Sequence, residues 1–396
     1  MNFYLQCGNG FKALSNRLNR LMGKTTFILS PRDLSEKSQI DFAHKLISEG
    51  HQVLFDPQLY APQSDKPNFT TYRYWPDDGK TGDETCLSTL LKELCFLNED
   101  LGTRAIILPT YKISHVGRDR NDKILRLIYK VIGERHYSKL PCYITLCLEQ
   151  NVLLDECQVD RLLNVSETWD VEGVYLVAEH PDSDYFVDNP FWMFQLMRLC
   201  AGMRLQGKQV ILGYANHQML CMTCMGIEAI ASGNWMNTRS FTFDKFKSDT
   251  GDIKRHKLWY YAPSLLTEYS IPYLDIAHRG KLLKLLDCRQ VVADTPASLL
   301  FDSQQKPSAV GYNLSDSFVH YLLSLDAQVK KCEVNGKYDA KRDYQMEMLQ
   351  TAKQSLSLLL KYRINGQNRD FFEILNVNET ALTMFDKEFG MRMSFV

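Results

Sequence analysis

Two short apolar runs decide the fold prediction: CYITLCL at Cys142–Leu148 and GVYLVA at Gly173–Ala178. Both runs are too short for a helix, and neither alternates between apolar and polar positions. Nearly continuous apolarity of this kind is typical of strands buried on both faces of a parallel sheet. Five further runs share this character: Thr25–Leu29, Gln52–Phe55, Arg104–Leu108, Gln209–Leu212 and Ile227–Ala231.

Segments with a helical pattern separate these runs. Ser35–Glu49 is amphipathic and is followed by Gly50, which is a common stop signal. Phe191–Leu205 is also amphipathic, and Gln218–Met225 reads as a shorter helix. Strand and helix therefore alternate at least six times, which indicates a parallel sheet with crossover helices.

The strand count favours a barrel. The seven runs and a weaker eighth at Pro272–Ile276 occupy roughly the 250 residues that a (β/α)8 barrel uses. An open doubly wound sheet is the alternative, but its first turn would be rich in glycine, and Ser30–Leu34 (SPRDL) is not. We predict an α/β fold with a (β/α)8 TIM-type barrel over residues 1–280. Residues 281–396 predict a mainly helical C-terminal module that packs on the barrel or on a partner.

Composition excludes several classes of protein. The chain has 396 residues, of which 45% are hydrophobic and 23% are charged, so it can bury a sizeable core. Its 46 basic and 47 acidic residues give a formal net charge of −1, which provides no global positive field for nucleic acid. Eleven dispersed cysteines do not resemble a secreted disulfide scaffold. No stretch approaches the roughly 20 apolar residues of a membrane helix. We predict a cytoplasmic protein with no membrane segment.

Candidate catalytic residues follow the predicted strands, because active sites of barrels lie at the carboxyl ends of the strands. Asp56 directly follows Gln52–Phe55, and burial there would raise its pKa and suit it to acid–base or nucleophilic work. An Asp that forms a turn before Pro57 is the alternative. Glu179 and Glu149 also follow apolar strands and are predicted as further catalytic carboxylates, with solvated loop residues as the alternative.

Polar residues at the other strand ends predict a substrate site. Small residues after Ile227–Ala231 would let the backbone approach a ligand, and an arginine there suits a phosphate. A tight turn with a surface arginine is the alternative. The predicted substrate-binding residues are Arg32, Gln58, Tyr214, Asn216, Asn234, Asn237 and Arg239.

A metal site is considered and not predicted. His217, Cys221 and Cys224 share one face of a helix at the spacing i, i+4, i+7. The run around them reads as a buried apolar helix, however, and cysteine is among the most buried residue types. We predict no metal and no cofactor.

Two stretches combine basic and aromatic residues. Thr71–Trp75 (TYRYW) interleaves an arginine with rings, and Lys112–Arg126 contains five basic residues, including Arg118 and Arg120. Such parts can bind single-stranded nucleic acid, although solvated loops and helix faces have the same composition.

The strand ends resemble those of the tRNA-guanine transglycosylase type of barrel. Val53–Asp56 is similar to the Asp that closes the family's second strand, and Glu149 and Glu179 occupy places like its polar residues after strands four and five. Gly226–Ile230 leading to Asn237–Arg239 looks like the strand-seven segment of the family, which runs into a Thr-Arg pair.

The chain also departs from the family. The family's nucleophilic Asp corresponds to Gly233, and its zinc-binding cysteine cluster has no counterpart after residue 240, where only Cys288 and Cys332 remain. The resemblance implies a transferase-like or N-glycosidase-like enzyme that acts on a nucleobase, a nucleoside or a base in nucleic acid, with Asp56 as its matching carboxylate.

Two other functions stay open. A non-catalytic binding or assembly protein would use the barrel rim and would recruit a protein partner through the helical tail. A different barrel enzyme, such as an aldolase or a phosphate-sugar lyase, is disfavoured because no predicted strand carries a lysine placed for a Schiff base.

Overall fold

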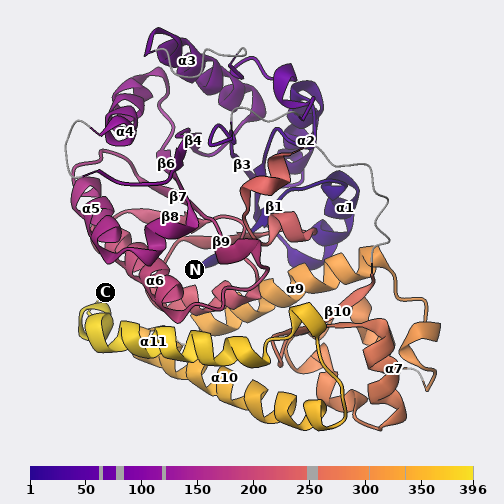
Figure 1. Cartoon of the computed structure of the whole chain (residues 1–396). Coiled ribbons are helices and arrows are strands. Elements are labelled where there is room, and N and C mark those ends of the chain that lie inside the picture. Colours follow the sequence, from indigo (N-terminus) through magenta and orange to yellow (C-terminus); the bar gives the residue numbers. More distant parts are fainter. Residues whose placement is uncertain are drawn as a thin grey trace.

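The computed structural model describes residues 1–61, 66–76, 84–117, 122–247, 257–302, 304–334 and 336–395. The chain forms a mixed α/β fold in which a curled parallel sheet is followed by a helical C-terminal part (Figure 1). No helix among these residues is both long enough and apolar enough to cross a membrane.

All strands of the main sheet run parallel, in the spatial order β3-β2-β1-β9-β8-β7-β6-β4, and β5 pairs with β6. The strands are β1 Asn2–Gln6, β2 Thr26–Leu29, β3 Gln52–Phe55, β4 Ile106–Leu108, β5 Lys112–Ile113, β6 Cys142–Leu148, β7 Gly173–Ala178, β8 Gln209–Leu212 and β9 Ala229–Ser232.

The sheet forms a half-barrel and not a closed eight-stranded barrel. The first strand pairs with β2 on one side and with β9 on the other, so the two ends of the strand sequence are neighbours. Between β3 and β4, no strand ladder forms in the described part of the chain, although the Arg104 amide donates to the Val53 carbonyl oxygen at 3.0 Å. β4 has only three residues, which is too short to pair fully on both sides. The prediction of a closed barrel is therefore wrong, because the sheet stays open between β3 and β4.

Strands contribute to two different apolar cores, which explains their continuous apolarity. In β6, Tyr143 and Cys147 face the cluster inside the half-barrel, whereas Ile144, Leu146 and Leu148 face the larger cluster beneath the helices. Successive side chains of a strand point to opposite faces, so burial on both faces requires apolar residues at almost every position. The prediction of buried parallel strands is confirmed.

Helices follow most of the strands. The bounds are α1 Phe11–Met22, α2 Glu36–Ser48, α3 Glu84–Leu101, α4 Lys123–Gly133, α5 Glu156–Ser166 and α6 Pro190–Leu205. The Asn189 side chain caps α6 by accepting from the amides of Phe191 and Trp192. The predicted helices at 35–49 and 191–205 are confirmed, whereas the helix predicted at 218–225 is a 3-10 helix over His217–Met225.

Two strand predictions need correction. The segment Pro272–Ile276, predicted as an eighth strand, lies inside helix α7 (Ile271–Arg279), where proline occupies the first turn and needs no hydrogen bond from its nitrogen. The strand that completes the set is β1, at the very start of the chain. The run Thr25–Leu29, predicted as the first strand, therefore contains the second strand, β2, and the numbers of the later strands shift accordingly.

The C-terminal part begins with an antiparallel hairpin and continues with helices. Its elements are β10 Trp259–Ala262, β11 Thr267–Ser270, α7, α8 Leu299–Asp302, α9 Leu314–Glu333, α10 Tyr338–Lys361 and α11 Phe372–Met393. Helix α9 packs on β1 and β10, and α11 packs on α6 and α10, along one side of the half-barrel (Figure 1). The apolar stripe of α10, including Leu349, Ala352 and Leu356, is buried in this packing. The domain boundary at 280/281 stays a prediction.

Candidate active site

Asp56 lies directly after β3, at the carboxyl edge of the half-barrel, and its side chain is fully buried. The hydroxyls of Tyr60 and Tyr214 each donate to its Oδ2 at 2.9 Å, and the single proton of the Tyr175 hydroxyl is shared between the same oxygen at 3.2 Å and Gln6 Oε1 at 3.1 Å. The backbone amide of Gln58 donates to Oδ1 at 3.1 Å. Three tyrosines from segments far apart in the sequence thus converge on one carboxyl group.

The protonated form of Asp56 is favoured by its surroundings. Burial raises the pKa of this carboxyl, and the bonds from Tyr60, Tyr214 and Gln58 offset only part of that effect. Asp56 forms no ion pair within the described residues. The charge of nearby Lys245 lowers the pKa only in part, and a buried carboxyl group with a raised pKa and no ion pair suits proton transfer.

Lys245 joins the site from the short 3-10 helix Phe243–Phe246. Its Nζ lies 3.1 Å from the centroid of the Tyr214 ring and 4.4 Å from that of Phe241. Burial and the nearby charge of Arg32 lower its pKa well below the ordinary value. Lys245 was not predicted because it lies outside every strand, and the only local signal is its position between aromatic residues in FTFDKF.

Backbone strain and unpaired polar atoms gather around Asp56. Gln58 and Tyr214 both have φ of 54°, the left-handed region that residues with a Cβ rarely adopt. Gln58 Nε2 donates to the Tyr214 hydroxyl at 2.8 Å. Gln58 Oε1 and Gln6 Nε2 are buried without a hydrogen-bond partner. Strain and unsatisfied polar groups of this kind concentrate at ligand sites.

The two predicted glutamates lie at the rim of the same edge. Glu179 is half-buried, its pKa is raised by burial, and its Oε2 accepts from the Gln150 amide at 3.3 Å. Glu149 accepts from Lys112 Nζ at 2.6 Å. The charges of Asp56, Glu179 and Glu149 all act on the pKa of Cys147, which is in β6. The structure therefore brings the three predicted carboxyl groups to one end of the sheet.

Arg32 borders this cluster. Its guanidinium is buried and donates to Asp33 Oδ2 from Nε at 3.2 Å and from a terminal nitrogen at 2.7 Å. Burial by itself would lower the pKa of Arg32, but Asp33, and to a smaller extent Tyr214 and Tyr60, raise it above its ordinary value. Three predicted substrate residues, Arg32, Gln58 and Tyr214, thus lie together beside Asp56.

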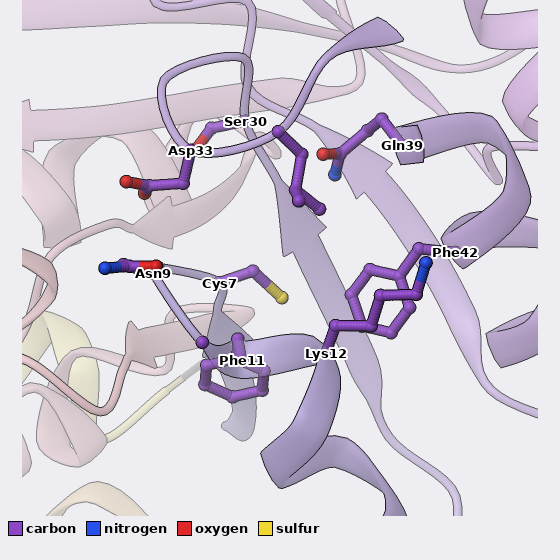
Figure 2. Close-up of a pocket in the computed structure, with 11 residues that line it drawn as sticks. Cys7, Asn9, Phe11, Lys12, Ser30, Asp33, Gln39 and Phe42 are labelled. Carbon is purple, nitrogen blue, oxygen red and sulfur yellow. The ribbon is translucent and has the colours of Figure 1, made fainter. Parts of the chain in front are cut away.

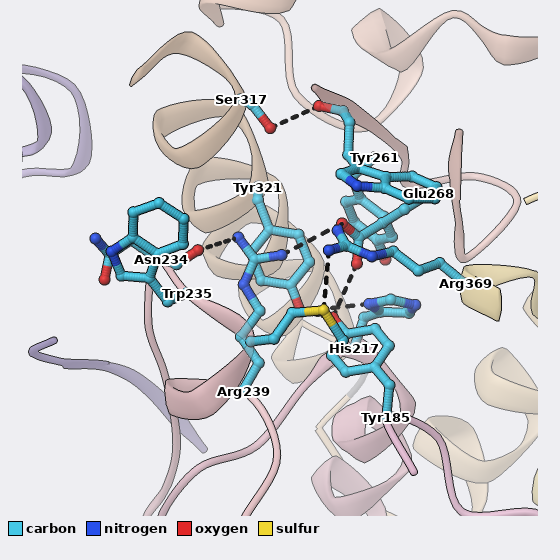
Figure 3. A network of polar contacts seen from close by, with 12 residues as sticks. Tyr185, His217, Asn234, Trp235, Arg239, Tyr261, Glu268, Ser317, Tyr321 and Arg369 are labelled. Carbon is cyan, nitrogen blue, oxygen red and sulfur yellow. Dashed lines mark hydrogen bonds and ion pairs between the residues drawn. The ribbon is translucent and has the colours of Figure 1, made fainter. Parts of the chain in front are cut away.

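Arg239, by contrast, lies in a polar network between the half-barrel and the C-terminal part (Figure 3). It donates to the backbone carbonyls of Gly233 at 2.9 Å and Asn234 at 2.8 Å, and its guanidinium lies 3.4 Å from the Tyr321 ring centroid. It also pairs with Glu268 at 3.3 Å. These contacts use its donors, so the position of Arg239 gives its predicted ligand role no support.

Glu268 is the centre of this network. Arg369 pairs with it at 2.6 Å, and the Tyr185 hydroxyl donates to it at 2.9 Å. Burial alone would raise the pKa of Glu268, but Arg369 and Arg239 lower it to about 2.

The three predicted asparagines make contacts within the chain. Asn216 Nδ2 donates to the Tyr185 carbonyl at 2.7 Å, and Asn234 Nδ2 donates to the Asn9 carbonyl at 2.9 Å. The carbonyl of Asn237 accepts from Lys245 Nζ at 3.4 Å. None of these contacts tests whether the asparagines bind a substrate.

His217 lies among aromatic rings. Burial lowers its pKa to about 3, and its Nδ1 is 3.3 Å from the Tyr321 hydroxyl. Cys221 and Cys224 are buried, and burial raises the pKa of both thiols. No group of three possible metal ligands occurs among the residues that the structure describes.

Gly233 has no room for a side chain. A Cβ there would come within 2.3 Å of the Gln6 carbonyl oxygen and within 2.2 Å of Thr238 Oγ1. An Asp in the place of the transglycosylase nucleophile would therefore require the backbone to move.

A cavity of about 250 Å³ opens beside the turn between β1 and α1 (Figure 2). This cavity is not predicted from the sequence, because no strand is assigned before the Gly8-Asn9-Gly10 turn. The signal was the five-residue run NFYLQ directly before that turn. The lining residues are Cys7, Gly8, Asn9, Gly10, Phe11, Lys12, Ser30, Asp33, Leu34, Gln39 and Phe42.

Two basic residues of the basic-aromatic stretches form ion pairs. Arg73 pairs with Glu36 at 2.6 Å and with Asp100 at 2.8 Å, and Lys112 pairs with Glu149. Arg118 and Arg120 lie outside the described residues. Trp75 stacks on Phe69 with centroids 4.2 Å apart, at the edge of the cluster inside the half-barrel.

Comparison with known protein families finds no match, and neither does comparison with curated proteins. Among solved structures, the chain is similar to an uncharacterized conserved protein from Geobacillus kaustophilus, with a TM-score of 0.35 and 11% sequence identity. The similarity covers 62% of this chain and 95% of the other.

Proposed function

We propose that this chain is an enzyme that breaks or exchanges the glycosidic bond of a nucleobase-bearing ligand at the carboxyl edge of the half-barrel. The observation that carries the proposal is Asp56, a fully buried carboxyl group with a raised pKa, no ion pair among the described residues and four hydrogen-bond donors around it.

The unpaired polar atoms suit the edge of a base. Gln6 Nε2 is a donor without an acceptor, and Gln58 Oε1 is an acceptor without a donor. Nucleobases present donors and acceptors on one planar edge, and their faces stack on aromatic rings. The half-buried rings of Trp75 and Phe243 supply such faces at the border of the site.

Asp56 and Lys245 can share the proton transfers of hydrolysis. Protonated Asp56 gives its proton to the departing base nitrogen as the bond from that nitrogen to the sugar carbon breaks. Neutral Lys245 removes a proton from the water whose oxygen bonds to the same carbon. The resulting ammonium then returns a proton to the Asp56 carboxylate, so both groups regain their starting states. In an exchange reaction, an incoming base nitrogen takes the place of water.

The test is base release from a panel of ribonucleosides and ribonucleotides, measured by chromatography with the full chain. We expect Asp56→Asn to reduce release to background while the melting temperature changes little, and the exposed Asp188→Asn to leave release unchanged. No release of base by the wild-type protein would overturn the proposed reaction. Full activity of Asp56→Asn would remove Asp56 from it.

The C-terminal helices were predicted to pack on the barrel or on a partner, and Leu349, Ala352, Leu356 and Leu359 of α10 are buried within the chain itself.

A further inference from the structure

The cavity between β1, α1 and α2 is smaller than the usual pocket for a whole drug-sized ligand. Its volume of about 250 Å³ is below the roughly 300–1,000 Å³ typical of pockets for whole drug-sized ligands. Figure 2 shows the turn Cys7–Phe11 on one side and the residues that follow β2 on another, with Gln39 from α2 completing the lining.

The start of α1 presents uncompensated positive charge to this cavity. The first turn of this 12-residue helix contains no acidic residue, and its N-cap, Gly10, offers no side-chain hydrogen bond. The Phe11 and Ala13 amides donate to the Gly8 and Gly10 carbonyls, but the partial positive charge of a helix N-terminus still favours an anion. Lys12 lies in this first turn, where a cation is unfavourable unless an anion is bound nearby.

An independent observation on the opposite wall also indicates a ligand. Gln39 is 1% exposed, and its Oε1 has no hydrogen-bond partner. Its carboxamide points into the cavity (Figure 2). A buried acceptor without a donor destabilises the protein, and a ligand hydroxyl would supply that donor.

The acidic and thiol groups of the lining do not oppose an anion. Asp33 lines the cavity, but Arg32 donates two hydrogen bonds to its Oδ2, so the pair carries no net charge. Burial raises the pKa of Cys7, which keeps its thiol neutral. The Lys12 ammonium is the remaining charge on the lining.

We propose that this cavity binds the phosphate of a phosphate monoester whose adjoining group carries a hydroxyl, as in a sugar phosphate. The phosphate lies at the start of α1 beside Lys12, and the hydroxyl donates to Gln39 Oε1. Arg32 connects the cavity to the Asp56 cluster, because it pairs with Asp33 and lies close to Tyr60 and Tyr214. Identification of this phosphate as part of the substrate rests on the proposed function, whereas its binding does not.

The experiment is calorimetric titration of the full chain with inorganic phosphate and with ribose 5-phosphate. We expect both to bind, and Lys12→Glu to weaken both by about tenfold or more. Arg20→Glu makes the same charge change in the last turn of α1 and should leave both affinities unchanged. Gln39→Leu should weaken ribose 5-phosphate by about fivefold and inorganic phosphate by less than about twofold.

Three results would overturn the inference: no binding of either compound to the wild-type protein, full binding by Lys12→Glu, or equal effects of Gln39→Leu on both compounds. Thermal melting of each variant checks its fold, and Lys12→Ala replaces Lys12→Glu if the latter melts early. Binding of ribose 5-phosphate that depends on Lys12 and Gln39, in a protein that releases no base, would sustain this site and refute the proposed function.

Discussion

Asp56 and Glu268 are both buried carboxyl groups that accept hydrogen bonds from tyrosine hydroxyls, yet their electrostatic surroundings are opposite. Glu268 pairs with Arg239 and Arg369, and its pKa is about 2. Asp56 forms no ion pair among the described residues, and burial raises its pKa. The fully paired carboxylate joins two parts of the fold. The carboxyl group that forms no ion pair is the one suited to exchange a proton.

The largest effect is expected from Glu268→Gln. This change keeps the shape of the side chain but leaves the Arg239 and Arg369 guanidiniums buried without a counter-ion. Breaking a buried ion pair in this way costs about 3–5 kcal/mol. We therefore expect the free energy of unfolding in urea to fall by that amount at neutral pH. The exposed Glu347→Gln should change it by less than about 0.5 kcal/mol. A similarly small change for Glu268→Gln would show that the ion pairs of Glu268 do not stabilise the fold.

The pH dependence of the two sites should have opposite signs. The pKa of Glu268 is lowered from 4.5 to about 2 on folding, so its stabilisation is present above about 4.5 and is lost as the pH falls toward 2. The loss amounts to about 3 kcal/mol. The pKa of Asp56 is raised above 3.8, so its stabilisation is present at lower pH and is lost as the pH rises through the folded-state value.

Urea unfolding is measured for the wild-type protein, Asp56→Asn and Glu268→Gln over the acidic pH range. The difference in the free energy of unfolding between the wild-type protein and each variant gives the contribution of that carboxyl group. The stability advantage of the wild-type protein should grow with pH relative to Glu268→Gln and shrink with pH relative to Asp56→Asn. Parallel trends would show that the two carboxyl groups do not differ in this way.

Removal of one tyrosine donor should lower the free energy of unfolding more at Glu268 than at Asp56. Tyr185→Phe removes a 2.9 Å bond to a charged carboxylate, for which about 1.5–3 kcal/mol is expected. Tyr60→Phe removes a 2.9 Å bond to a carboxyl group whose neutral form is favoured, for which about 0.5–1.5 kcal/mol is expected. Unfolding at neutral pH compares the two variants, and equal costs would contradict the assigned charge states.

The smallest effect on stability is expected from Lys245→Met. The amine has a lowered pKa and lies over the Tyr214 ring rather than in an ion pair, so we expect a change below about 1 kcal/mol. Base release should nevertheless fall to background if Lys245 takes up the proton of water. Lys247→Met, two residues away and fully exposed, serves as the control and should retain activity. Unchanged base release by Lys245→Met would exclude the lysine from the reaction.

The sequence alone predicted the part of the site that depends on strand ends. Asp56 follows an apolar run directly, and Gln58 and Tyr214 follow strands in the same way, so these residues could be placed at one edge of the sheet. Tyr175 could not be predicted as a site residue, because in the sequence it is one of several apolar or aromatic residues within a strand. Lys245 could not, because its contact with Tyr214 depends on how a loop folds back over the strands.

Local pattern determined the alternation of buried parallel strands and covering helices, because continuous apolarity over four to seven residues has few other stable solutions. It did not determine whether the sheet closes, which depends on the short β4, or that the chain begins with a strand whose glycine turn borders a cavity. Only the tertiary structure decided which buried carboxyl group has a lowered pKa and which has a raised one. The charge of such a group depends on the partners that reach it, and the two arginines of Glu268 come from segments 130 residues apart, at 239 and 369.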